Sequence, residues 1–204
     1  MKHATGIGRL AGLAVGLGVG AALAATPGVA SADDFQISID GIDLFPTAGN
    51  TATATSGMGD IAIAFGNGAY ADASGGLFDS AFADGTGSAA GAGTGSFDTA
   101  IANGTDSGAL ASGDIVTDSS GTHTYLGNDD FAYALGSHTI AESGVLLTKT
   151  ASSDDIAAVI DPSGTAGSTA YAGEGNFDFA AAFGDMLHAD ATEFNFLVDI
   201  LPSL

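Results

Sequence analysis

Three aspartates at a constant spacing are the residues of this sequence most suited to chemistry. Asp60, Asp79 and Asp98 are nineteen residues apart, and each begins the pattern Asp-x-Ala-Φ-Ala, in which Φ is Ile or Phe. On successive layers of a β-structure their carboxylates would lie about 4.8 Å apart. Carboxylates at such a short distance raise one another's pKa or require a cation between them. Carboxylate oxygens are hard ligands, which suit Ca²⁺. The spacing therefore predicts a calcium ladder at these three residues.

The same aspartates also have a structural interpretation. An Asp in a turn bonds its own backbone and faces water, which would keep a chain rich in Ala and Gly soluble. The calcium β-roll pattern G-G-x-G-x-D is not matched, and Gly59-Asp60 and Gly113-Asp114 are only fragments of it. Both alternatives stay open at the level of sequence.

Motifs for catalysis are scarce. The chain has no Cys and no G-x-S-x-G nucleophile motif. Asp106-Ser107-Gly108 resembles the Asp-Ser/Thr-Gly motif of aspartic proteases, but the second copy that this chemistry requires is absent. His123, His138 and His188 do not have the spacing of paired metal ligands. We therefore expect no enzymatic activity, and no cofactor other than Ca²⁺.

The aspartates belong to a repeat that runs through most of the chain. Looser copies start at Asp130, Asp155 and Asp178, and a second alternating segment separates successive copies. Alternation with period two is typical of β-strands, and a fixed repeat length is typical of stacked repeats. The sequence predicts an all-β fold, a parallel β-solenoid or β-roll of about six irregular turns with terminal caps. The alternatives are an antiparallel β-sandwich and a largely disordered chain.

The alternation allows two assignments of the strand faces. In the first copy, Ile61, Ile63 and Phe65 share one face, and the intervening alanines share the other. We expect the bulky residues to lie inside, because burying them contributes most to stability. Beyond the N-terminal segment, Gly, Ser and Thr interrupt every candidate helix except residues 154–160.

Residues 1–32 have the features of a secretory signal peptide. Lys2 and Arg9 precede an uncharged apolar stretch, and Ala30-Ser31-Ala32 forms a small-x-small cleavage site. We therefore expect a secreted or cell-envelope protein without a membrane span after processing. The processed chain keeps one basic residue, Lys149, and all 24 acidic ones, a net charge of −23. This charge argues against nucleic acid as a partner, because phosphates would not be neutralised.

The processed chain divides by composition into three segments. Residues 33–56 include an alternating N-terminal strand, residues 57–185 form the repeat domain rich in Ala, Gly and Asp, and residues 186–204 include the most apolar stretch. Because solenoids need atypical ends to close their exposed edges, we predict that both end segments are caps. The alternative for the C-terminal segment is an oligomer contact or a membrane-docking site.

Two stretches resemble known proteins. Residues 62–75, AIAFGNGAYADASG, resemble the Ala-x-Ala-x-Gly head repeats of trimeric autotransporter adhesins, which implies a left-handed β-roll. The nineteen-residue spacing is longer than in those heads, and no heptad stalk or membrane-anchor barrel follows. The stretch TPGVASADD and the body rich in Ala and Gly resemble small exported proteins of mycobacteria and related actinomycetes, which implies export.

Together these features predict a non-enzymatic secreted or cell-envelope protein with a structural or adhesive role, acting through an extended acidic β-surface. The expected partners are cell-wall material, a host surface or further copies of the chain. One alternative is an extracellular calcium-binding matrix or solenoid protein. A surface-acting hydrolase on a solenoid scaffold is the other.

Overall fold

The protein is described from a computed structural model, which places residues 34–44, 50–118, 121–144, 152–162, 167–173, 176–192 and 196–200. These residues form strands joined by turns. Within these ranges there is no helix, and hence none that could cross a membrane. The predicted signal peptide, residues 1–32, lies outside the described residues.

Nine strands form the longer of two large sheets, in the order β2-β1-β4-β6-β9-β14-β17-β19-β21. From β4 to β21 all neighbours are parallel, whereas β1 is antiparallel to both β2 and β4. The strand bounds are β1 (Phe35–Ile39), β2 (Ile42–Leu44), β4 (Ile61–Phe65), β6 (Ser80–Asp84), β9 (Thr99–Asn103), β14 (Phe131–Gly136), β17 (Ile156–Asp161), β19 (Phe179–Phe183) and β21 (Phe196–Ile200).

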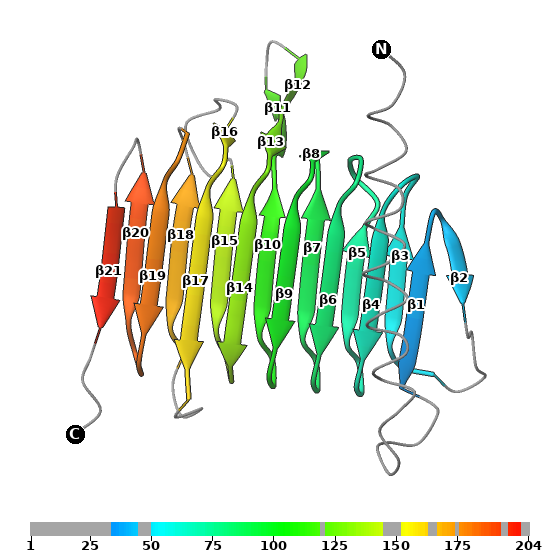
Figure 1. The fold of residues 1–204 in the computed structure, drawn as a ribbon, viewed down its shortest axis with the longest axis horizontal. Coiled ribbons are helices and arrows are strands. Elements are labelled where there is room, and N and C mark those ends of the chain that lie inside the picture. Colours follow the sequence, from blue (N-terminus) through cyan, green and yellow to red (C-terminus); the bar gives the residue numbers. More distant parts are fainter. Residues whose placement is uncertain are drawn as a thin grey trace, which may run out of the picture.

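Seven strands form the second sheet, in the order β20-β18-β15-β10-β7-β5-β3, and all of them are parallel. From β3 onward the strands of the two large sheets alternate along the chain, so the sheets form two facing layers of one elongated stack (Figure 1). The bounds are β3 (Thr53–Ser56), β5 (Tyr70–Ala73), β7 (Ala89–Gly93), β10 (Gly108–Ser112), β15 (Ile140–Gly144), β18 (Thr169–Gly173) and β20 (His188–Thr192).

Two small elements occupy one long edge of the stack (Figure 1). Strands β8 (Gly95–Ser96), β13 (Gly127–Asn128) and β16 (Ser152–Ser153) form a short parallel sheet at the corner. Between β10 and β13 the chain inserts the antiparallel hairpin β11 (Asp114–Asp118) and β12 (Gly121–Tyr125), which projects from this edge. The hairpin explains why one repeat spacing lengthens from 19 to 32 residues.

Strand pairing follows the sequence repeat residue by residue. Ala81 lies opposite Ala62 on one side and Ala100 on the other, so equivalent repeat positions form straight columns. The predicted all-β fold with parallel sheets is confirmed, and the arrangement is consistent with a β-solenoid. The suggestion of a helix at residues 154–160 is wrong. Most of that segment belongs to strand β17. Its residues alternate between the two faces of the strand, which places Ala157 and Val159 in the interior.

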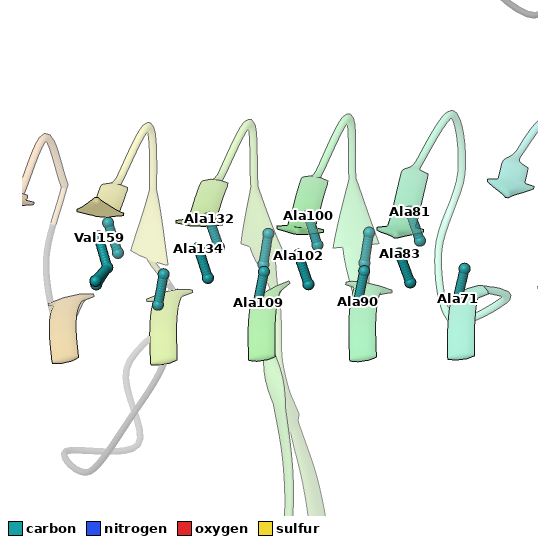
Figure 2. Close-up of a cluster of buried hydrophobic side chains, with 14 of the residues drawn as sticks. Ala71, Ala81, Ala83, Ala90, Ala100, Ala102, Ala109, Ala132, Ala134 and Val159 are labelled. Carbon is teal, nitrogen blue, oxygen red and sulfur yellow. The ribbon is translucent and has the colours of Figure 1, made fainter. Parts of the chain in front are cut away.

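Alanine fills the interior of the stack. Figure 2 shows Ala81, Ala83, Ala100 and Ala102 of one sheet pointing toward the alanines of the other. These side chains are at most 3 % exposed. The prediction that the bulky residues lie inside is therefore wrong for the stack as a whole. Only four residues connect β6 to β7, and the resulting close approach of the sheets leaves room for little more than a methyl group from each side.

The bulky residues instead lie in columns on the outer surfaces, where they are half-buried by their neighbours in the same column. Phe82 and Ile101 are adjacent in one such column, and the rings of Phe179 and Phe196 stack with centroids 4.8 Å apart in another. Packing along a column removes part of the apolar surface from water without enlarging the interior. Stability thus comes from small residues inside and from ladders of larger ones outside.

Enlarging one inward alanine should disrupt the stack. We expect Ala102→Leu to lower the free energy of unfolding by about 3 kcal/mol, because the fully buried methyl has no space for three more carbons. Denaturant unfolding followed by circular dichroism measures the loss. Ala89→Leu is the matched control, since Ala89 is exposed on the outside of β7. Equal stability of the two variants would contradict the alanine interior.

Candidate functional site

Six aspartates form a buried column along the corner that leads into the longer sheet. Each of them immediately precedes a strand, β4, β6, β9, β14, β17 or β19, and each is at most 1 % exposed. We call this set the aspartate column: Asp60, Asp79, Asp98, Asp130, Asp155 and Asp178. The carboxylates are stacked as the repeat spacing predicts. The alternative in which each aspartate faces water is wrong, because burial excludes these side chains from solvent.

Backbone hydrogen bonds link the column from layer to layer. Oδ1 of Asp60 accepts a hydrogen bond from the backbone N–H of Asp79 at 2.9 Å, and Oδ1 of Asp79 accepts one from Asp98 at 3.0 Å. The same contact continues through the remaining members at 2.8–3.1 Å. Each carboxylate from Asp60 to Asp155 therefore accepts a hydrogen bond from the next layer where the chain turns between sheets.

The second carboxylate oxygen points at a glycine three residues earlier in the chain. A Cβ on Gly57 would lie 2.7 Å from Asp60 Oδ2, and one on Gly95 would lie 2.9 Å from Asp98 Oδ2. Gly76 and Gly127 stand in the same relation to Asp79 and Asp130. The pattern Gly-x-x-Asp is therefore part of the site. The sequence signal for it is the recurrence of Gly three residues before Asp, at Gly57, Gly76, Gly95 and Gly127.

The residue just before each aspartate turns the side chain inward. This position has a positive φ in every repeat, although Phe occupies it three times. Bulky residues adopt this conformation at an energetic cost, so the surrounding hydrogen bonds must hold it. Phe78 and Phe97 offset part of this cost, because their rings stack with centroids 5.3 Å apart.

Burial dominates the electrostatics of the aspartate column. It raises the pKa of Asp79 to about 6, of Asp130 to about 7 and of Asp98 to about 8, while the backbone N–H of the next layer acts in the opposite direction. Neighbouring carboxylates of the column add to the upward shift. In Asp60, Asp79, Asp98 and Asp130, Oδ2 is buried without a hydrogen-bond partner. A charged oxygen is costly there, which favours the protonated acid or a bound cation.

Metal-ligand clusters are not found in the described part of the chain. There, no group of three or more His, Asp or Glu side chains is placed to hold a metal ion. His138 Nε2 lies 3.7 Å from Asp106 Oδ2, and His188 Nδ1 lies 2.6 Å from Thr169 Oγ1, far apart along the stack. The side chain of His123 is outside the described residues. The calcium ladder at Asp60, Asp79 and Asp98 stays a prediction.

A second candidate site is the outer surface of the seven-stranded sheet, which we call the acidic face. Its central column contains Asp72, Glu142, Tyr171 and Asp190, one from each of four strands. Tyr70 Oη donates a hydrogen bond to Asp72 Oδ2 at 2.9 Å. Burial raises the pKa of Glu142, and burial together with the neighbouring acids raises that of Tyr171.

Between these groups lies a shallow depression of about 330 Å³. Gly91 forms its floor in the central column, and Tyr70, Leu110, Ile140 and Glu142 are among the residues that line it. The depression exists because Gly91 carries no side chain between Asp72 and Leu110. Sequence reasoning missed this face, because its residues are spread over strands separated by 19 residues or more and share no motif.

Comparison with protein-family models, with curated proteins and with solved structures gives no match.

The aspartate column should make stability fall as pH rises. Asp79, Asp98 and Asp130 have folded-state pKa values above the ordinary value of 3.8, so the folded protein binds more protons than the unfolded chain between about pH 4 and pH 8. We expect the Tm at pH 4.5 to exceed that at pH 8 by roughly 5–10 °C. Thermal unfolding followed by circular dichroism at both pH values measures the difference.

Asp98→Asn separates the charge from the hydrogen bond, since Asn keeps the Oδ1 acceptor for Asp130 N–H and cannot ionise. We expect this variant to have a higher Tm than the wild type at pH 8 and a weaker dependence on pH. Asp190→Asn changes an exposed carboxylate and should leave the slope unaltered. A Tm of Asp98→Asn that falls at pH 8 with an unchanged slope would show that the column works as charged groups.

Proposed function

We propose that the protein is a secreted, non-enzymatic structural or adhesive protein of the cell envelope, a β-solenoid of about six turns that binds through its acidic face. The observation that carries the proposal is the central column of that face, in which Asp72, Glu142 and Asp190 recur along one straight sheet. Carboxylates that recur along one column, three and then two strand spacings apart, suit a partner that is itself extended and carries cationic or hydroxyl groups.

The side chains around these acids support adhesion. Tyr70 and Tyr171 place aromatic rings beside carboxylates, a combination that offers apolar contact and hydrogen bonds to the same partner. The depression beside them is shallow and has a single carboxylate, Glu142, in its lining. Hydrolysis by paired carboxylates requires two, at a separation that fits the substrate, so the lining favours binding over catalysis.

The net charge of the chain also supports binding through the acidic face. Lys149 is the only basic residue after position 32. A partner with cationic groups would meet no repulsion from the acidic face, while phosphate-rich partners would be repelled. Export fits this role, because a surface-acting protein must reach the envelope or the medium.

Binding to insoluble cell-wall polysaccharide tests the proposal. Purified residues 33–204 are sedimented with the wall material, and the bound fraction is measured over a range of protein concentrations. We expect the triple variant Asp72→Asn, Glu142→Gln, Asp190→Asn to bind at least tenfold more weakly, about 1.4 kcal/mol, because it removes the carboxylates of the acidic face. Binding should survive EDTA and weaken with added NaCl.

Asp84→Asn is the matched control, since Asp84 lies on the outer surface of the other sheet. It should bind as the wild type does. If the triple variant bound as tightly as Asp84→Asn, the acidic face would not be the adhesive surface.

Calcium binding by the aspartate column is the second candidate function. It is favoured by the buried Oδ2 atoms of Asp60, Asp79 and Asp98, for which a cation would supply a partner. Calorimetric titration of the protein with millimolar CaCl₂ tests it. Calcium binding predicts heat above that of dilution, weakened in Asp79→Asn, and a circular-dichroism change on adding EDTA. Heat indistinguishable from dilution would remove this candidate.

A further inference from the structure

The depression on the acidic face results from a gap in a column of outward side chains. In the column beside the central one, Tyr70 of β5 and Ile140 of β15 are large, whereas Ala89 of β7 and Gly108 of β10 between them are small. A Cβ added to Gly108 would meet no atom within 4 Å, so the space above this residue is open. The depression therefore lies over β7 and β10, and the strands at its two ends are three strand spacings, or about 14 Å, apart.

The walls of the depression are largely apolar. Leu110 leans toward β7, since its Cδ1 lies 3.1 Å from the position that a Cβ on Gly91 would take. Leu110, Ile140 and Tyr70 are 39–43 % exposed, so these side chains offer apolar contact to a ligand. Ligand sites combine such apolar walls with a few polar groups that fix the orientation of the ligand.

The polar groups at the two ends of the depression accept hydrogen bonds. Tyr70 Oη donates its one proton to Asp72 Oδ2 at 2.9 Å, and this bond raises the pKa of Tyr70, so the remaining lone pair of the phenol is an acceptor. At the other end Glu142 offers a carboxylate. Strands β7 and β10 of the floor are paired on both sides, so the sheet uses their backbone N–H groups. The lining therefore calls for a ligand rich in donors.

Glu142 also calls for a positive charge. In the described part of the chain, this carboxylate has no hydrogen bond and no ion pair, and no basic residue lines the depression. Burial raises the pKa of Glu142, which means that its charged form lacks compensation. A cationic donor on the ligand would supply that compensation.

We propose that the depression binds hexosamine units with free amino groups, as part of the wall polysaccharide. The inference rests on the adhesive function proposed above and specifies what the acidic face recognises. The ammonium group of the sugar donates hydrogen bonds to the Glu142 carboxylate, and a sugar hydroxyl donates to Tyr70 Oη. The C–H groups of the pyranose ring pack against Leu110 and Ile140.

The acceptors of the site select the free amine over the acetamide. Acetylation replaces a cation with three N–H donors by a neutral group with one N–H and a carbonyl oxygen. No side chain of the lining has a free donor for that carbonyl, so it would lose its hydrogen bond to water without replacement. A neutral sugar would leave Glu142 uncompensated. A flexible aminoalkyl chain would satisfy Glu142, but it would lose more conformational freedom on binding than a rigid ring does.

Calorimetric titration of residues 33–204 with soluble sugars tests the inference. The probes are the hexamer of β-1,4-linked glucosamine and its fully N-acetylated counterpart, both at about pH 6, where the amine is charged. We expect the amine hexamer to bind at least about tenfold more tightly than the acetylated one, because only the amine forms a charged pair with Glu142. Glu142→Gln should lose about tenfold in affinity for the amine hexamer and little for the acetylated one.

Gly108→Ile tests the depression without changing any acidic residue. The side chain of Ile fits the open space above Gly108, and β-branched residues suit a strand, so the variant should fold with an unchanged or higher Tm. By filling the depression, it should lose at least about tenfold in affinity for the amine hexamer. Ser80→Ile is the matched control on the outer surface of the other sheet, where Ile61 is its neighbour, and should bind as the wild type does.

Three outcomes would overturn the inference. Equal affinity for the amine and acetylated hexamers would show that the free amine is not recognised. Full binding of the amine hexamer by Gly108→Ile would place the contact outside the depression. Equal affinity for hexalysine, which carries the same number of cationic groups, would show that charge alone is recognised.

Failure of this inference and failure of the adhesive function give different results. If the wild type sedimented with wall material, the triple variant did not, and neither hexamer was preferred, adhesion through the acidic face would stand and the hexosamine site would fall. If the amine hexamer bound as expected and the wall material did not, the depression would stand as a sugar site and the adhesive function would fall.

Discussion

The close approach of two parallel sheets across a layer of methyl groups is the constraint on which the rest of the structure depends. Because Ala102 and most of its equivalents leave no space for larger side chains, nearly all bulky residues of the repeats point outward, with Val159 of β17 as an exception. The interior then contributes regular backbone pairing and little apolar volume. Much of the stability therefore comes from the outer columns, where packing of side chains along the stack replaces a conventional core. The outer surfaces are consequently free to differ, and one became apolar and the other acidic.

The tight corners that follow from this closeness explain the buried aspartates. Where the chain turns into the longer sheet, the side chain of one layer takes the place of a backbone acceptor for the N–H of the next, as between Asp60 and Asp79. A neutral side chain such as Asn could accept the same hydrogen bond, so the carboxyl adds a dependence on pH rather than a unique geometry. Carboxyls with raised pKa values also carry less negative charge than the composition implies.

The sequence predicted the stacking of Asp60, Asp79 and Asp98, because it follows from their constant spacing. It misassigned the faces because burial of large side chains is the usual rule, and the rule fails when two sheets meet at methyl distance. One signal favoured the correct assignment. The positions of Ala81 and Ala83 are alanine in nearly every repeat, whereas the position of Ser80 is also Ile, Thr or Phe. A position that is alanine in nearly every repeat is typical of the confined interior. An acidic β-surface was predicted, but the residues of the acidic face were not, because they meet only through the pairing of distant strands.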